Sequence, residues 1–271
     1  MGSEITVPCG QCIGCKIQRS KEWALRICHE TSQHQDNAFL TLTYDPEHLP
    51  SDHSLCIEHF QKFMKRYRKY LGKKRIRYYH CGEYGSQLSR PHYHAIIFGH
   101  MFDDLIPFST RDGVTTYTSP TLERLWGKGY VTIGHVTFES AAYVARYCQK
   151  KITGDQAELH YGVCDPLTGE WFQVHPEYAT QSKGIGRAWY EKYSTDCFPS
   201  DFLIHNGKKL KVPKYYERLY QLEEPEKLFQ IKKARKAAAK LHADNNTYDR
   251  LEVRKEVLTA KLSKLKRGYE Q

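Results

Sequence analysis

Hydrophobic residues recur along the chain with two different periods, and these periods predict where helices and strands lie. A spacing of three and four residues predicts amphipathic helices, and alternation predicts strands with one buried face. The Ser119-Pro120 pair marks the start of one helix. The expected helices span residues 16–30, 57–71, 120–126, 139–151 and 188–193, and the expected strands span residues 39–44, 75–81, 91–98 and 130–136.

This order of elements predicts an α+β fold with a mostly antiparallel central sheet flanked by helices, because strands 75–81 and 91–98 have a hairpin-length connection. Residues 162–186 give no clear pattern. Residues 214–267 predict two basic helices separated by Asp244-Asn245-Asn246. We expect three parts: a Cys-rich N-terminal segment (1–15), a core domain (16–206) and a basic helical C-terminal extension (207–271).

The charge pattern adds an expected partner, since a formal net charge of +10 favours a polyanion. Residues 207–271 hold 18 Lys and Arg against 9 Asp and Glu. Lys65, Arg66 and Lys69, on the predicted helix 57–71, are candidate DNA contacts that would bind phosphates without reading bases. The alternative for such a face is an ordinary solvated surface. The local basic cluster comprises Lys62, Lys65, Arg66, Arg68, Lys69, Lys73, Lys74, Arg75 and Arg77.

Cysteine usage and hydropathy bear on the compartment. Nine cysteines is an odd number, and no apolar signal segment opens the chain, which argues against a secreted disulfide framework. No stretch approaches the roughly 20 apolar residues that span a bilayer. We expect a protein of a reducing cytoplasm without a membrane partner.

Three of the cysteines form a Cys-x-x-Cys-x-x-Cys motif at Cys9, Cys12 and Cys15, a spacing that favours metal binding. Cys28 or His29 could supply a fourth ligand to a structural zinc ion. An iron–sulfur cluster and an unmetallated loop are the alternatives, although the ferredoxin-type fourth Cys followed by Pro is absent.

A second candidate metal site comes from His92 and His94. On a strand these two imidazoles share one face, and with a third ligand they could hold one divalent cation. Glu83 is the candidate third ligand, because a carboxylate suits Mg²⁺ or Mn²⁺, and His80 is its substitute. The alternative is a pair of hydrogen-bonded surface histidines.

Tyr143 and Tyr147 lie four residues apart on the predicted helix 139–151, so both hydroxyl groups can reach one site. Each is followed three residues later by a cation, Arg146 and Lys150, and Lys151 follows. These cations could favour the charge of an attacking tyrosine oxygen or hold phosphates, so Arg146 and Lys151 are further candidate DNA contacts. Two tyrosines at this spacing can equally be core aromatics.

Taken together and in order, these motifs resemble the HUH-endonuclease replication initiators of single-stranded DNA viruses, and most closely the gokushovirus type. The resemblance covers most of the chain. It rests on Val-Pro-Cys-Gly-Gln-Cys-Ile-Gly-Cys (7–15), the 39–45 strand, Gly-Glu-Tyr-Gly (82–85), Pro-His-Tyr-His (91–94), Tyr-Val-Ala-Arg-Tyr-Cys-Gln-Lys-Lys (143–151) and Lys-Gly-Ile-Gly-Arg (183–187).

The resemblance implies an HUH nicking domain over residues 16–206 and a defined chemistry. The His pair would bind a divalent cation that polarises a phosphate, while Tyr143 or Tyr147 attacks phosphorus, leaving a 5′-phosphotyrosyl link and a free 3′-hydroxyl. Lys150 stands where the lysine of the family's Tyr-x-x-Lys motif would be. Two tyrosines would let the protein cut origin DNA for rolling-circle replication and rejoin strands at termination.

Other expectations follow from the absence of a G-x-x-x-x-G-K-[ST] motif and from the loop at residues 183–187. Strand opening would need a separate host helicase, and synthesis a host DNA polymerase, in the cytoplasm of the host bacterium. Lys183 and Arg187 are candidate DNA contacts beside backbone amides that could meet a phosphate, the alternative being a plain turn. Two rival functions remain open: a non-catalytic, zinc-containing DNA-binding protein, and a phosphodiesterase using activated water.

Overall fold

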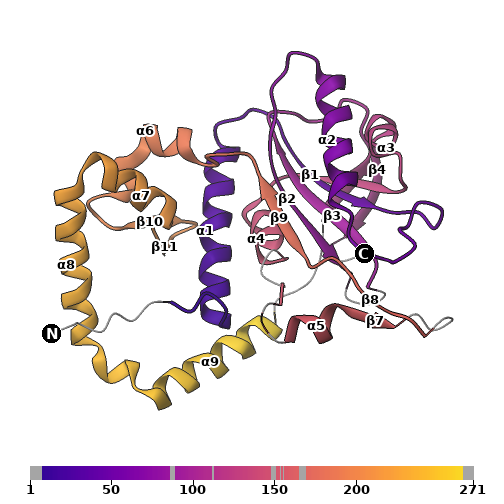
Figure 1. Ribbon diagram of the computed structural model, residues 1–271. Helices are drawn as coiled ribbons and strands as arrows, with labels where there is room; N and C mark the ends of the chain where they lie inside the picture. Colours follow the sequence, from indigo (N-terminus) through magenta and orange to yellow (C-terminus); the bar gives the residue numbers. More distant parts are fainter. Residues whose placement is uncertain are drawn as a thin grey trace.

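The computed structural model describes residues 8–85, 89–111, 113–147, 151–152, 154, 156–164 and 169–264, with only the backbone of Tyr147. Its central element is a seven-stranded antiparallel sheet with strand order β4-β5-β6-β1-β3-β2-β9 (Figure 1). The α+β class and the antiparallel sheet predicted from the sequence are confirmed. The strands of this sheet are β1 (Asn37–Thr43), β2 (Arg77–Tyr84), β3 (Pro91–Phe98), β4 (Ile106–Arg111), β5 (Val114–Thr118), β6 (Val131–Gly134) and β9 (Tyr178–Gln181).

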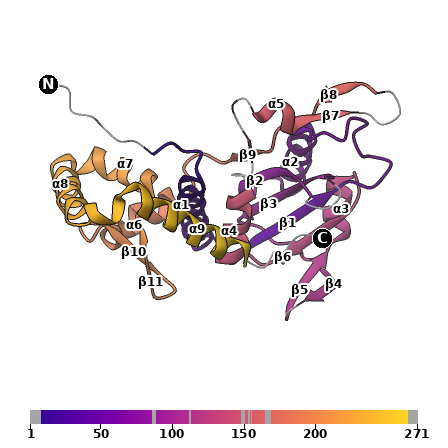
Figure 2. The ribbon, with the colours of Figure 1, turned by 90° about the horizontal axis from the view of Figure 1, so that it is seen from below.

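Alternation along β3 divides the core into two layers. Tyr93, Ala95 and Ile97 pack in one cluster with residues of α2 (Ile57–Leu71) and α3 (Pro120–Trp126). Ile96 and Phe98 pack in the other cluster with α1 (Ile13–Thr31) and α4 (Phe138–Tyr147). Figure 2 shows α4 lying between α1 and the sheet. The sheet therefore separates the α2 layer from the α4 layer.

A helical region lies on the far side of α1 from the sheet (Figure 1). Leu25 of α1 joins Tyr190, Leu203 and Tyr216 in a third core cluster, so α1 packs on both parts of the molecule. None of the helices in the described part of the chain is long and apolar enough to cross a membrane. The elements of this region are α6 (Arg187–Cys197), β10 (Phe202–His205), β11 (Lys208–Lys211), α7 (Lys214–Glu223), α8 (Pro225–Leu241), the 3₁₀ turn η1 (Ala243–Asn246) and α9 (Tyr248–Ser263).

Several boundaries differ from the sequence prediction. The strand β2 runs on to Tyr84, because residues 82–84 continue the pairing with β3. The tyrosine helix α4 is described to Tyr147, and Lys151 lies outside it. Residues 156–181 contain α5 (Gln156–Tyr161), β7 (Gly162–Cys164), β8 (Trp171–Gln173) and β9, none of which the sequence pattern predicts.

The C-terminal region contains an additional break. Glu224-Pro225 separates α7 from α8, because Pro is tolerated only in the first turn of a helix, and η1 then covers the predicted break at residues 244–246. The domain boundary expected between residues 206 and 207 falls in the turn of the β10–β11 hairpin. A division of the chain at that point stays a prediction.

Candidate metal and nucleophile site

Glu83, His92 and His94 converge on one face of the sheet. Glu83 pairs with His92 across β2 and β3, and Cys81 pairs with His94, so alternation places the three side chains on the face that α4 covers. Glu83 Oε1 lies 3.0 Å from His92 Nε2 and 2.9 Å from His94 Nε2. The three ligand atoms lie within 4.8 Å of one another, which is close enough for one cation.

Burial and hydrogen bonds fix the charge of this cluster. Glu83 and His94 are each 1% exposed, and His92 is 15% exposed. Burial alone would raise the pKa of Glu83, but its contacts with His92 and His94 outweigh burial and lower the pKa to about 2. The carboxylate is therefore ionised at neutral pH and available to a hard cation.

The Nδ1 atom of each imidazole also has a hydrogen-bond partner. His92 Nδ1 donates to the Arg90 carbonyl at 3.1 Å, and His94 Nδ1 lies 3.1 Å from Thr41 Oγ1. Such bonds orient a histidine ligand and leave Nε2 pointing to the site. The role of Thr41 was not predicted from the sequence. Thr41 lies two residues after Phe39 on β1, so both side chains lie on this face of the sheet.

Tyr143 of α4 reaches this cluster. Its ring meets the His94 ring edge to face, with centroids 5.2 Å apart, and it also contacts Phe39. Tyr143 is 2% exposed. The backbone of Tyr147 lies one turn further along α4, whereas its side chain and all of Lys150 lie outside the described residues.

His80 does not belong to the site. It lies on the opposite face of β2, fully buried, with its ring stacked on Phe60 at 3.3 Å and Nδ1 3.1 Å from Thr180 Oγ1. Burial lowers the pKa of His80 well below its usual value. Strand alternation therefore excludes His80 as a substitute for Glu83 in the role of third metal ligand.

The candidate DNA contacts on α2 lie on the other side of the sheet from the His pair. Lys65 and Lys69 are exposed there. The guanidinium of Arg66 donates to the carbonyls of Leu125 and Trp126, at 2.7 and 2.8 Å, and so caps the end of α3. Arg66 thus has a structural role that the sequence pattern did not indicate.

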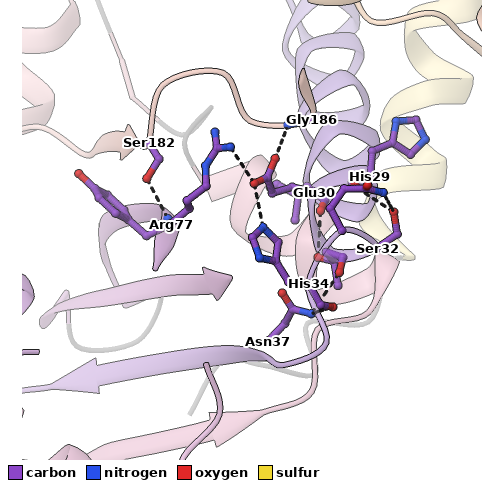
Figure 3. A network of polar contacts seen from close by, with 12 residues as sticks. His29, Glu30, Ser32, His34, Asn37, Arg77, Ser182 and Gly186 are labelled. Carbon is purple, nitrogen blue, oxygen red and sulfur yellow. Dashed lines mark hydrogen bonds and ion pairs between the residues drawn. The ribbon is translucent and has the colours of Figure 1, made fainter. Parts of the chain in front are cut away.

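Two backbone N–H groups of the loop at residues 183–187 donate hydrogen bonds to other groups of the protein. Figure 3 shows Glu30, which is 1% exposed, accepting from the Gly186 N–H at 2.7 Å, with Arg77 and His34 each 3.1 Å away. The Arg187 N–H donates to the Gly184 carbonyl. These two amides are therefore already bonded within the protein, and a phosphate contact at this loop stays a prediction.

The basic side chains near this loop and near α4 are placed differently. Lys183 is exposed, and exposed Arg187 pairs with Glu191 at 2.8 Å. Arg146 is half-buried on α4, and the carbonyl of exposed Lys151 accepts from Lys16 Nζ at 3.4 Å. A groove of about 810 Å³ lies beside Arg77, lined by His34, Arg68, Gly72, Lys73, Lys74, Arg75, Ile76 and Arg77.

The N-terminal cysteines form a second group. Cys9, Cys12 and Cys15 have their sulfur atoms within 4.8 Å of one another. Cys28 lies thirteen residues beyond Cys15 on α1, about 20 Å along the helix axis. The alternative, His29, bonds Tyr216 Oη at 2.9 Å and stacks on Trp189. The structure brings neither proposed fourth ligand to the three cysteines.

Comparison with known proteins identifies the family. A family model described as replication-associated protein ORF2/G2P matches residues 37–152, the segment that holds Glu83, both histidines and Tyr143. Replication-associated protein VP4 of Bdellovibrio phage phiMH2K is 36% identical over 81% of this chain and 69% of its own length. Replication-associated protein ORF2 of Spiroplasma virus 4 is 36% identical over 87% of this chain and 74% of its own.

A third relative, replication-associated protein ORF4 of Chlamydia phage 1, is 33% identical over 79% of this chain and 53% of its own length. No solved structure matches the chain significantly. Because identity above 30% extends over most of this chain and most of two relatives, the chain belongs to the replication-associated proteins of the ORF2/G2P family found in gokushoviruses.

Proposed function

We propose that this protein is a metal-dependent endonuclease and strand transferase that initiates rolling-circle replication by nicking single-stranded origin DNA. The observation that carries the proposal is the packing of Tyr143 against His94 beside Glu83 and His92. A hydroxyl nucleophile, a buried carboxylate and two imidazoles are the groups that a metal-assisted phosphoryl transfer needs.

The donor set fits a hard divalent cation. Glu83 Oε1 and the Nε2 atoms of His92 and His94 would hold Mg²⁺ or Mn²⁺. A bound cation would supply Lewis acidity, neutralising charge on the scissile phosphate.

The residues of the chain would divide the remaining work. The hydroxyl of Tyr143 or Tyr147 would attack phosphorus, losing its proton as the O–P bond forms, while the bond to the 3′-oxygen breaks and that oxygen takes a proton from solvent. Arg146, Lys150 and Lys151 would offset the negative charge of the phosphates.

The products explain why two tyrosines are useful. A 5′-phosphotyrosine conserves the energy of the phosphodiester, and the free 3′-hydroxyl primes synthesis. At termination the second tyrosine would cut the regenerated origin, and the released 3′-hydroxyl would attack the first phosphotyrosine to rejoin the strand. No nucleotide is consumed, so duplex opening and synthesis would fall to a host helicase and polymerase in the host cytoplasm.

Access is a further element of the mechanism. Because Tyr143 is 2% exposed, DNA would reach its hydroxyl only after the side chains packed around it had moved. Contacts to phosphates by Lys65, Lys69, Lys183 and Arg187 would add affinity that depends on salt and not on base sequence.

The test uses labelled single-stranded oligonucleotides that tile the genome encoding the chain, incubated with full-length protein and Mn²⁺. We expect cleavage of one oligonucleotide and a protein–DNA adduct that survives SDS. Tyr143→Phe combined with Tyr147→Phe should abolish both, whereas Tyr130→Phe combined with Tyr193→Phe, at exposed tyrosines, should change neither.

The outcomes separate the rival functions. Adduct formation by the Tyr143→Phe and Tyr147→Phe double variant would refute the assigned nucleophiles. Cleavage by the unmutated protein without any adduct would favour activated water, and binding without cleavage would favour a non-catalytic DNA-binding protein.

A further inference from the structure

The three N-terminal cysteines form a compact sulfur cluster that the proposed nicking chemistry does not use. Cys9 Sγ lies 4.0 Å from Cys15 Sγ, and Cys12 completes a group whose sulfurs are all within 4.8 Å. All three are free thiols, since 4.0 Å is about twice the length of a disulfide bond.

The backbone is shaped to hold these sulfurs together. Gly10 adopts a φ of +76°, which turns the chain between Cys9 and Cys12. The Cys12 N–H donates to Cys9 Sγ at 3.3 Å. Cys12 is the N-cap of α1 and Cys15 lies in its first turn, so the helix start fixes the positions of both residues.

The spacing of the sulfurs discriminates between metals. Zinc binds thiolate at about 2.3 Å with tetrahedral geometry, which separates two coordinated sulfurs by about 3.8 Å. The Cys9–Cys15 separation of 4.0 Å is close to that value. In an iron–sulfur cluster the thiolates bind different irons, which spreads them further apart. We propose that Cys9, Cys12 and Cys15 bind one Zn²⁺ ion at the N-terminus of α1.

The surroundings suit such a site. Three thiolates and one Zn²⁺ carry a net charge of −1, and Lys16 follows Cys15 directly. The Arg19 guanidinium comes within 3.5 Å of where a side chain on Gly10 would begin. Within the described ranges no further Cys, His, Asp or Glu joins the group.

The zinc acts as a clip on α1, because it ties residues 9–12 to the first turn of that helix. Ser20 Oγ of α1 donates to the Ala142 carbonyl of α4 at 3.5 Å, and Lys16 Nζ donates to the Lys151 carbonyl at 3.4 Å. The clip thus steadies the end of α1 that packs along the helix carrying Tyr143. The two candidate metal sites also differ in the metals that they favour, because one offers thiolates and the other offers the carboxylate of Glu83 and two imidazoles.

Metal analysis of the full-length protein tests this proposal without DNA. Protein purified without chelators should contain about one zinc per chain. Cobalt titration of the zinc-depleted protein should give the intense near-ultraviolet sulfur-to-cobalt band and the visible bands of a tetrahedral thiolate site. The triple variant Cys9→Ser, Cys12→Ser and Cys15→Ser should lose the zinc and these bands.

Three controls define the site. Cys28→Ser and Cys56→Ser should retain the zinc, and so should His92→Ala combined with His94→Ala. Zinc removal from the unmutated protein should also speed trypsin cleavage after Lys16 and Arg19. Retention of zinc by the triple serine variant, or iron and sulfide in its place in the native protein, would overturn the proposal. Since no readout involves cleavage of DNA, its failure leaves the nicking proposal untouched.

Discussion

Glu83 is a buried carboxylate whose negative charge faces two imidazoles at 2.9 and 3.0 Å. Removing its charge while keeping its shape isolates its role as a ligand. We expect Glu83→Gln to lower Mn²⁺-dependent cleavage by at least about 100-fold, because a Lewis-acid contribution is several kcal/mol. Cleavage rates across a Mn²⁺ titration provide the measurement.

Glu252→Gln, at a half-buried glutamate on α9 that pairs with Lys255, is the control far from the metal ligands in sequence and should leave the rates unchanged. Equal rates for Glu83→Gln and the unmutated protein would exclude Glu83 as a metal ligand.

Thr41 tests the support behind the metal ligands. Thr41→Val removes the hydroxyl beside His94 Nδ1 but preserves the shape of the side chain. We expect the Mn²⁺ concentration for half-maximal cleavage to rise about 10-fold, because loss of the hydrogen-bond partner of a metal-binding histidine usually weakens metal affinity by at least that factor. Thr41→Ser keeps the hydroxyl and should need the same Mn²⁺ concentration as the unmutated protein. Thr115→Val, on the β4–β5 hairpin, should also leave that concentration unchanged. A normal Mn²⁺ dependence in Thr41→Val would count against this orienting role.

His29 gives the molecule a pH dependence of known sign. Burial, with repulsion from His205, lowers the pKa of His29 to about 3, while the unfolded chain titrates near 6.5. Its contribution to stability is full above pH 6.5 and is lost as the pH falls from 6.5 towards 3. At pH 5 the loss amounts to about 2 kcal/mol.

His29→Phe keeps an aromatic ring against Trp189 but cannot titrate. Urea unfolding between pH 7 and pH 5 should therefore show a shallower loss of the free energy of unfolding for this variant. His53→Phe, at an exposed histidine, should keep the unmutated slope. Parallel slopes for His29→Phe and the unmutated protein would contradict this origin of the pH dependence.

At the scale of elements, the basic groove at the end of α2 is a surface whose charge can be changed without breaking a fold contact. Lys73 and Arg75 line it, whereas Lys74 pairs with Asp36 and Arg77 with Glu30. We expect Lys73→Gln with Arg75→Gln to weaken binding of single-stranded DNA. The slope of log affinity against log salt should fall by about 1.4, or 0.7 for each phosphate contact.

Lys73→Arg with Arg75→Lys preserves both charges and should bind as the unmutated protein does. Fluorescence anisotropy at several salt concentrations measures both quantities. An unchanged salt slope in the neutral variant would mean that DNA does not contact this groove.

Local patterns predicted some elements of the site and could not predict others. His92 and His94 share a face by strand alternation alone, and Tyr143 lies on a helix that its spacing predicts. Glu83 needed the β2–β3 register, since the pattern ended that strand at residue 81. The short strands β7 to β11 escaped prediction because three or four residues carry too little periodicity, and their pairing is set by tertiary contacts.

At the scale of the whole molecule, Gly186 lies where three helices meet. Its N–H bonds Glu30 of α1, and a Cβ there would lie 2.3 Å from Tyr216 Oη of α7, at a φ of +81°. We expect Gly186→Ala to lower the free energy of unfolding by about 3 kcal/mol, because overpacking adds to backbone strain.

Gly207 is the matched control, since it has a φ of +72° but open space around it. Gly207→Ala should cost only about 1 kcal/mol of backbone strain. Urea denaturation of both variants gives the comparison. Equal losses of unfolding free energy in the two variants would show that Tyr216 moves away from residue 186 without destabilising the protein.

A DNA strand that contacted both the basic groove and the His pair would have a minimum footprint set by the direction of β2. Arg77 at its start borders the basic groove and Glu83 near its end borders the His pair, six residues or about 20 Å apart. At the spacing of about 3.4 Å in a stacked strand, that span would take about six nucleotides. A stacked oligonucleotide shorter than this would occupy only one of the two places, so binding at the groove and cleavage would become separable by substrate length alone.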